Sequence, residues 1–299
     1  MPSRTIVVSG ASGLIGSALV PELERLGHRV LRLVRREPIG ANEVRWNPSA
    51  HLFDERQLAN VDVVVNLVGE TIAQRWTTAR RRRIRDSRVA STDALVTAIA
   101  KTPKRAMALI NASAIGYYGD RGDDPLDEKD PAGRGFLAEI CRQWEAAANV
   151  ATRYGARVVT MRTGLVLSPK GGALAAMLTP FRLGVGGRLG NGRQWMSWIA
   201  IGDLVRGIVW LIEHPEIAGP INMTAPNPVT NSDFTRALGK AMHRPAVFAV
   251  PKIALRAVFG EMAEETLLAS QRAVPRVLLA SGFTFDSPTI DEALAKTLG

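Results

Sequence analysis

Three glycines near the start of the chain, at positions 10, 13 and 16, have the spacing G-x-x-G-x-x-G. They follow the strand-like run Thr5–Ser9 and begin a segment with helical periodicity. Backbone N–H groups without neighbouring side chains can approach a phosphate closely, and a helix N-terminus attracts negative charge. The motif therefore predicts that a dinucleotide pyrophosphate binds at Gly10, Ser12, Gly13, Leu14, Ile15 and Gly16. The alternative is a tight strand–helix turn without a ligand.

Two arginines, Arg35 and Arg36, follow the second strand-like run, Arg29–Val34. Folds that bind NAD place an acidic residue at this point, about 20 residues after the glycines, to hydrogen-bond the ribose 2′-hydroxyl. A carboxylate repels a 2′-phosphate, whereas a guanidinium binds one through charge-assisted hydrogen bonds. The pair predicts NADP(H) as the cofactor, and two solvated arginines at a strand end are the alternative.

A third strand-like run, residues 61–67, ends in Leu67, Val68 and Gly69. Open α/β sheets bind their ligands outside the carboxyl ends of the strands, and a glycine there lets the backbone pass close to a ligand. We therefore expect these three residues to lie under a bound dinucleotide.

The segments that position these residues alternate between strands and helices. Predicted strands are Thr5–Ser9, Arg29–Val34, 61–67, 106–111 and Arg157–Thr163, and predicted helices are 13–26, Thr78–Lys101 and 135–154. The strands are continuous apolar runs, which is typical of parallel strands covered on both faces. The alternation predicts right-handed βαβ units and an α/β fold with a doubly wound parallel sheet of the Rossmann type.

The second half of the chain is interrupted by glycines and prolines. A strand–helix segment at 198–213 and a strand at 220–223 are expected to return to the sheet, and helices are expected near 231–242, 252–260 and 264–273. We expect a Rossmann domain over residues 1–164, to which 198–223 returns. A smaller, interleaved C-terminal α/β lobe over 165–299 is expected on the substrate side.

The composition restricts the class of function. The formal net charge is +10, and the arginines from Arg80 to Arg88 crowd one predicted helix. This cluster is interpreted as a solvated helix face, and because no nucleic-acid-binding motif accompanies it, nucleic acid is not an expected partner. The single cysteine, Cys141, excludes an intramolecular disulfide and a cysteine-based metal cluster, and no metal is expected. No secretory signal or membrane-spanning run is evident, which predicts a cytoplasmic protein with no membrane partner.

Several stretches together resemble a known family. They are Gly10–Gly16, Asn66–Gly69, 87–88, 111–119, 144–145, 162–164, 222–230, 270–272, Pro275 and 282–283. The chain resembles the atypical extended short-chain dehydrogenase/reductases, in the nucleoside-diphosphate-sugar epimerase-like group with a C-terminal domain of unknown function, sometimes labelled cell division inhibitor-like. The resemblance implies a Rossmann fold with a bound nicotinamide dinucleotide, which Arg162 helps to enclose, under a smaller C-terminal lobe. It also implies that Ser113 hydrogen-bonds a substrate carbonyl.

The chain departs from the active pattern of that family at one important pair of positions. Active members carry Tyr-x-x-x-Lys on the helix after the fourth strand, where the Lys lowers the pKa of the proton-donating Tyr and holds the ribose. Alignment on Glu145 places Leu137 and Cys141 at these positions, and Cys141 is interpreted as a small buried hydrophobe. The nearest replacement acids are Tyr117 and Tyr118, which either supply the proton or simply pack in a loop.

Two functions follow from these expectations. The first is an NADP(H)-dependent oxidoreductase or epimerase that acts on a small carbonyl or alcohol, or on a sugar-nucleotide-like substrate, and uses Ser113 with Tyr117 or Tyr118. The second is an NADP(H)-binding redox sensor or scaffold with little catalysis, which the missing Tyr and Lys favour. A monomer and a homodimer are both compatible with the sequence.

Overall fold

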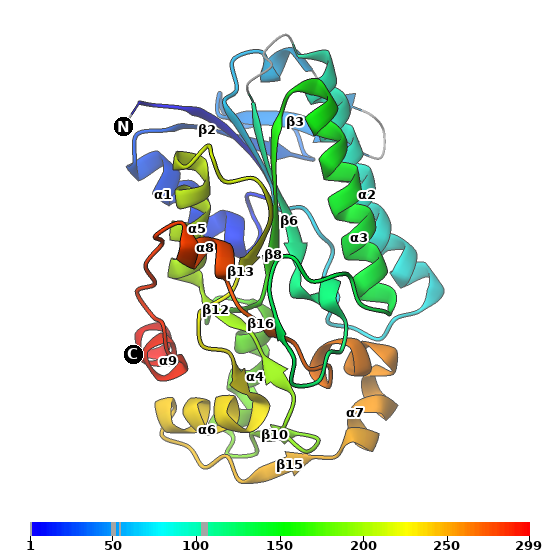
Figure 1. Ribbon diagram of the computed structural model, residues 1–299, viewed down its shortest axis with the longest axis vertical. Helices are drawn as coiled ribbons and strands as arrows, with labels where there is room; N and C mark the ends of the chain where they lie inside the picture. Colours follow the sequence, from blue (N-terminus) through cyan, green and yellow to red (C-terminus); the bar gives the residue numbers. More distant parts are fainter. Residues whose placement is uncertain (1, 49–51, 54, 103–106) are drawn as a thin grey trace.

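The computed structural model describes residues 2–48, 52–53, 55–102 and 107–299. Seven parallel strands form the central sheet in the order β13-β8-β6-β5-β1-β2-β3 (Figure 1). They are β1 (Thr5–Ser9), β2 (Arg29–Val34), β3 (Glu43–Asn47), β5 (Val63–Asn66), β6 (Ala108–Ala114), β8 (Arg157–Thr163) and β13 (Gly219–Met223). The short strand β4 (Leu52–Phe53) is antiparallel to β3 at the edge.

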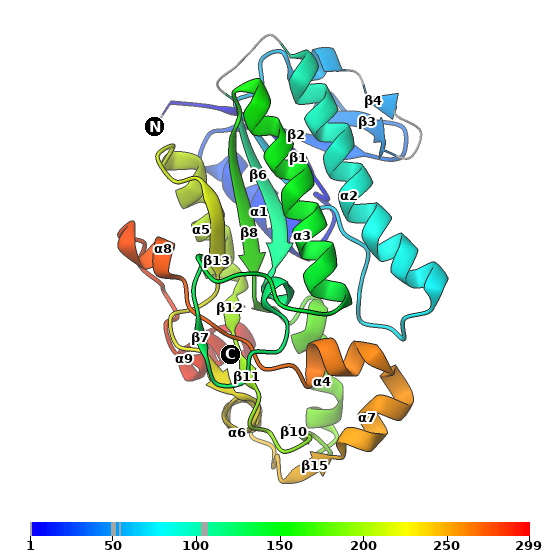
Figure 2. The same cartoon turned by 45° about the vertical axis from the view of Figure 1, so that its right-hand side comes forward.

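Helices cover both faces of this sheet. On one face, Ile6 and Val8 of β1 share a buried apolar cluster with α1 (Leu14–Arg25) and α5 (Ile201–Glu213). On the other face, Val7 packs in a second cluster with α2 (Thr78–Lys101). Figure 2 shows α3 (Phe136–Asn149) lying beside α2 over this second face. The predicted doubly wound α/β fold is confirmed.

The strand order reverses at β1, which has β2 on one side and β5 on the other. The connections from β1 to β2 and from β5 to β6 therefore leave the sheet on opposite faces. Ligands of open α/β sheets bind outside the carboxyl ends of the strands at such a point. The predicted glycine loop lies at this place, because it connects β1 to α1.

The C-terminal lobe has a core of its own, built around Trp198, Phe234 and Leu294. Its strands and helices are β9 (Leu165–Leu167), α4 (Gly172–Arg182), β10 (Gly187–Leu189), β11 (Trp195–Met196), β12 (Trp198–Ala200), β14 (Val229–Thr230), α6 (Asn231–Ala241), β15 (Phe248–Val250), α7 (Lys252–Phe259), β16 (Arg272–Ala273), α8 (Arg276–Ala280) and α9 (Ile290–Leu298). The lobe is interleaved with the sheet domain, since β13 pairs with β8 and β16 pairs with β7 (Pro125–Leu126).

Some predicted elements differ from those observed. The helix expected at 264–273 is a π-helical turn at Ala263–Leu267, followed by β16. The helix expected at 135–154 ends at Asn149 and continues as a 3-10 turn. The strand expected at 198 does not join the central sheet, because β12 pairs with β9. The strand predicted at 106–111 is β6, although residue 106 lies outside the described residues.

Candidate functional site

The glycine loop has the close packing that its spacing predicted. Gly10 has a positive φ of 71°, and a Cβ there would lie 2.9 Å from the carbonyl oxygen of Leu67. A Cβ on Gly16 would overlap the carbonyl oxygen of Gly10. A Cβ on Gly13 would meet only that same oxygen, at 3.2 Å, and otherwise open space. The loop therefore joins the ends of β1 and β5 tightly while its outer side stays free.

Among the residues that the structure describes, no side chain caps the N-terminus of α1. Gly13 is the N-cap and supplies no side chain, and the first turn carries no acidic residue. The amides of Leu14, Ile15 and Gly16 are thus the first three of the helix, where an anion is bound most favourably. Ser12 and Gly13 are exposed. Free amides, exposed Ser12 and Gly13, and open space beside Gly13 are the features that a dinucleotide pyrophosphate requires.

The C-terminal lobe begins beside this loop. A Cβ on Gly171 would lie 3.4 Å from Leu14 Cδ1, and one on Gly172 would lie 3.0 Å from Leu14 Cδ2. Gly172 is the first residue of α4. The start of α4 therefore flanks the start of α1, and both lobes border the candidate site.

A buried hydrogen-bond network fixes the strand ends around the loop. Asn66 at the end of β5 accepts from Ser9 Oγ at 2.6 Å. Its amide nitrogen donates to Asn111 Oδ1 at 2.7 Å and to Thr92 Oγ1 at 2.9 Å. The network joins β1, β5, β6 and α2, and it holds Leu67 against Gly10. The structure thus brings the 67–69 segment to the glycine loop.

The two arginines after β2 have different surroundings. Arg36 forms a bidentate ion pair with Glu43, at 2.7 and 2.8 Å. This guanidinium, together with the backbone N–H of Ile39, lowers the pKa of Glu43 to about 2. Arg35 is exposed, and no hydrogen bond or ion pair to its side chain occurs among the residues that the structure describes. Arg35 is consequently the one of the pair whose guanidinium is available to a 2′-phosphate.

The side chain of Ser113 is buried between β6 and α3. Its side chain is 4% exposed, and its hydroxyl donates to Glu145 Oε1 at 2.7 Å. Glu145 also accepts two hydrogen bonds of 2.9 Å from Nε and Nη2 of Arg162. The Ser113 proton is therefore committed to a buried carboxylate. The expected role of Ser113 as donor to a substrate carbonyl stays a prediction, and it requires this hydrogen bond to be exchanged for one to the substrate.

Tyr118 is part of the same buried network. Its ring is fully buried, and its hydroxyl donates to Asn222 Oδ1 at 2.8 Å while Arg162 Nη1 donates to it at 3.0 Å. Burial raises the pKa of Tyr118 to about 12. Tyr118 thus links the end of β6 to Arg162 on β8 and Asn222 on β13, and its expected role as a proton donor stays a prediction.

Tyr117 remains as the candidate acid. Its side chain is half-buried, and its ring lies against the Arg162 guanidinium, whose central carbon is 3.5 Å from the ring centroid. None of the residues in the described part of the chain hydrogen-bonds its hydroxyl. Tyr117 therefore has a free donor at the carboxyl end of β6. Arg162 pairs with Glu145 and lies against both tyrosine rings, and its expected part in enclosing the cofactor stays a prediction.

The positions of the missing Tyr and Lys lie on the buried side of α3. Cys141 is 4% exposed, and burial raises the pKa of its thiol to about 11, which agrees with a small buried hydrophobe. Leu137 is half-buried and packs against Gly116, where a Cβ would lie 3.3 Å from Leu137 Cβ. The Glu265 carboxylate accepts from the backbone N–H groups of Phe136 and Leu137, at 2.9 and 2.8 Å. The C-terminal lobe therefore caps α3, and Leu137 lies against Gly116, the residue before Tyr117.

Glu145, Glu128 and Glu265 are the polar site residues that the sequence analysis did not single out for a role. Glu128 is buried and accepts from the backbone N–H groups of Asn222 and Val277, at 3.1 and 3.2 Å. Burial raises the pKa of Glu128. Of these three, Glu145 had a signal in the sequence, the Trp-Glu pair that matches the family. Glu128 and Glu265 had none, because their partners lie about 90 residues or more away along the chain.

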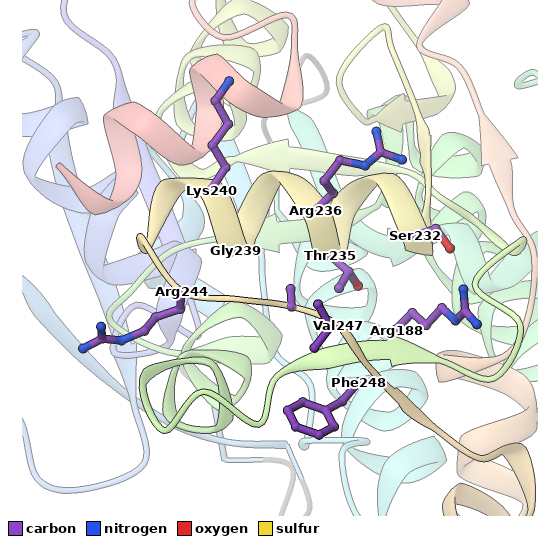
Figure 3. Close-up of a pocket in the computed structure, with 10 residues that line it drawn as sticks. Arg188, Ser232, Thr235, Arg236, Gly239, Lys240, Arg244, Val247 and Phe248 are labelled. Carbon is purple, nitrogen blue, oxygen red and sulfur yellow. The ribbon is translucent and has the colours of Figure 1, made fainter.

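A groove of ≈ 540 Å³ lies apart from the candidate site, between α6 and the segment that leads into β15 (Figure 3). Four basic residues, Arg188, Arg236, Lys240 and Arg244, are among those that line it. Two of these cations are paired at the surface, Arg236 with Asp233 and Lys240 with Asp291. In the described ranges, no group of three or more His, Cys, Asp or Glu side chains is arranged to hold a metal ion. No helix in these ranges has the length and apolar character needed to cross a bilayer.

The sequence profile of the NAD dependent epimerase/dehydratase family matches residues 6–223. The chain belongs to this family. A domain of unknown function, DUF1731, matches residues 250–297, so this epimerase family member is of the atypical short-chain dehydrogenase/reductase group with that C-terminal domain. The family resemblance found in the sequence is confirmed.

Relatives of this family member match over its whole length. An epimerase family protein of Mycobacterium bovis is 50% identical over 98% of this chain and 97% of its own. The crystal structure of human epimerase family protein SDR39U1 with NADPH is 32% identical, with a TM-score of 0.87 over 98% of this chain and 99% of that one. A nucleoside-diphosphate sugar epimerase from Corynebacterium glutamicum is 37% identical, with a TM-score of 0.82 over 100% of this chain and 59% of that one.

Proposed function

We propose that this protein binds NADP(H) and acts as an oxidoreductase or epimerase on a small carbonyl or alcohol, or on a sugar-nucleotide-like substrate. The observation that carries the proposal is the uncapped N-terminus of α1, with its glycines packed against Leu67 and open space outside Gly13. This arrangement suits a pyrophosphate. The NADPH in the crystal structure of the human relative supports the same cofactor.

The preference for NADP(H) is proposed to come from Arg35. An exposed guanidinium without a carboxylate partner can form charge-assisted hydrogen bonds with a 2′-phosphate, whereas Arg36 is held by Glu43. The backbone of Leu67, Val68 and Gly69 is proposed to line the same dinucleotide, because Gly10 fixes it beside the loop.

The bound nicotinamide supplies the hydride chemistry, and the residues of this chain handle the proton. Reduction of a carbonyl creates an alkoxide that must be stabilised or protonated as it forms. Tyr117 is proposed as this donor, since its hydroxyl is free and its half-buried side chain follows the carboxyl end of β6. General acid catalysis contributes about 10²- to 10⁴-fold, so a donor without a lysine partner predicts slow turnover on unactivated ketones.

Turnover on a panel of carbonyl compounds, followed by NADPH oxidation, tests this proposal. The best substrate is compared across the wild type, Tyr117→Phe, Tyr118→Phe and Ser113→Ala, with NADPH affinity measured for each. We expect Tyr117→Phe to lower kcat at least tenfold and to leave NADPH affinity unchanged. Full activity of Tyr117→Phe contradicts the assignment of the donor.

A second candidate function is an NADP(H)-binding sensor or scaffold with little catalysis. It is favoured by the commitment of Ser113 to Glu145 and by the apolar residues Leu137 and Cys141 where the family's Tyr and Lys would lie. Tight NADPH binding without turnover on any compound of the panel supports this candidate over the first.

A further inference from the structure

Arg88 differs from the other arginines of α2. Carboxylates pair with the other arginines of this helix: Arg80 and Arg83 with Glu70, Arg81 with Glu261, and Arg82 and Arg85 with Asp86. No carboxylate in the described part of the chain forms an ion pair with Arg88, which points inward. The basic cluster is therefore not a single solvated face, and one of its cations has another role.

Backbone oxygens and an aromatic ring fix the Arg88 guanidinium. Nη1 donates to the Ile84 carbonyl oxygen at 2.9 Å, and Nη2 donates to the Glu70 carbonyl oxygen at 3.0 Å. The guanidinium carbon lies 5.3 Å from the centroid of the Trp144 ring. A guanidinium has five N–H donors, so these contacts hold its direction and leave donors unused. Burial of this cation is costly without a compensating anion or ligand, and it lowers the pKa of the Arg88 guanidinium.

Arg88 lies beside the segment assigned to the dinucleotide. A Cβ on Gly69 would come within 3.1 Å of Arg88 Nη2, so the absence of a side chain at Gly69 makes room for the guanidinium. On its other side Arg88 approaches α3, where its positive charge acts on the Cys141 thiol and opposes the effect of burial on the pKa of that thiol. The Arg88 guanidinium thus lies between the end of β5 and Cys141 of α3, which carries no charge.

We propose that Arg88 is a cofactor-binding residue that donates hydrogen bonds to the sugar–phosphate part shared by NADPH and NADH. This inference rests on the proposed cofactor site. It assigns the positive charge of that site to α2, because Cys141 on α3 supplies none. Arg88 and Arg35 then have separable effects. Arg35 contacts the 2′-phosphate and distinguishes the two nucleotides, whereas Arg88 contacts what the two nucleotides have in common.

Titration calorimetry with NADPH and with NADH tests the inference on Arg88→Met. One charge-assisted hydrogen bond corresponds to about 10- to 150-fold in affinity. We expect Arg88→Met to weaken both nucleotides by the same factor within this range. Arg85→Met is the matched control, since Arg85 lies on the same helix with a surface pair, and it is expected to bind both nucleotides as the wild type does.

A thermal melt without nucleotide accompanies each titration. Arg88→Gln provides a second variant, because it keeps a donor for the Glu70 carbonyl oxygen and removes the charge. If the variants melt at a lower temperature but bind both nucleotides with wild-type affinity, Arg88 only holds the 69–70 segment and the inference is overturned. A loss confined to NADPH overturns it as well. If the wild type binds neither nucleotide, the proposed function fails instead.

Discussion

Replacement of Glu145 by glutamine tests whether the polar network behind the candidate site is structural. The side chains of Arg162 and Glu145 are 4% and 9% exposed, and two hydrogen bonds of 2.9 Å join them. Although burial acts to lower the pKa of Arg162, the carboxylate and Tyr118 hold it above its usual value. Glu145→Gln keeps the size of the side chain and removes its charge. The amide has one acceptor oxygen for the guanidinium, where the carboxylate has two.

The expected loss of stability in Glu145→Gln follows from the charge of Arg162, which remains buried. Removal of one partner from a buried ion pair costs about 3–5 kcal/mol, because the other charge stays buried without compensation. Arg162 retains contacts to Tyr118 and to the Glu128 carbonyl oxygen, which do not neutralise it. We therefore expect the free energy of unfolding to fall by about 3–5 kcal/mol. For a chain of this size, this corresponds to a decrease in Tm on the order of 10 °C.

Urea unfolding followed by tryptophan fluorescence measures this loss. Glu139→Gln is the matched control, because Glu139 lies on the same helix and forms an exposed pair with Arg142. Exposed pairs contribute about 0–1 kcal/mol, so the control is expected to change little. If Glu145→Gln and Glu139→Gln lose similar amounts, both below about 1 kcal/mol, the network does not stabilise the fold and the argument is refuted.

Two further predictions concern the loop and the buried tyrosine. Gly13→Val places a branched side chain where the structure has open space beside the loop. We expect the variant to fold but no longer to increase the fluorescence of NADPH. Normal NADPH binding would contradict the proposed phosphate site. The pKa of Tyr118 is about 12 in the folded state against 10.0 ordinarily, so the unfolded state ionises first and stability is lost as pH rises from about 10 to 12. The urea midpoint is therefore expected to decrease less between pH 9 and pH 11 in Tyr118→Phe than in the wild type. An equal decrease in both proteins would show that burial does not raise the pKa of Tyr118.

Sequence patterns predicted the elements that have regular periodicity. The bounds of β1, β8 and α2 agree with the expected Thr5–Ser9, Arg157–Thr163 and Thr78–Lys101, because continuous apolar runs and long helical segments have few alternatives. The strand β3 was not predicted. Its buried Val44 and Trp46 alternate with polar residues over only five positions, and a short alternation of this kind is weak evidence by itself.

The sequence indicated which segments lie together where this depends on strand ends, and not where it depends on partners far away along the chain. The glycine loop and the 67–69 segment come together because parallel strands align their carboxyl ends at one edge. The hydrogen bond from Ser113 to Glu145 spans 32 positions, and that from Tyr118 to Asn222 spans 104. Only tertiary packing places these groups together, so no local pattern could reveal that both side chains serve a buried network.

The proposed binding of NADP(H), and its selection through Arg35, can be tested by titration calorimetry of NADPH and NADH on the wild type and on Arg35→Ala, with Arg36→Ala as the matched control. We expect the wild type to bind NADPH more tightly than NADH. We expect Arg35→Ala to lose about 10- to 150-fold in affinity for NADPH, with the affinity for NADH nearly unaffected. Equal affinity of the wild type for both nucleotides, or tighter binding of NADH, would contradict this proposal.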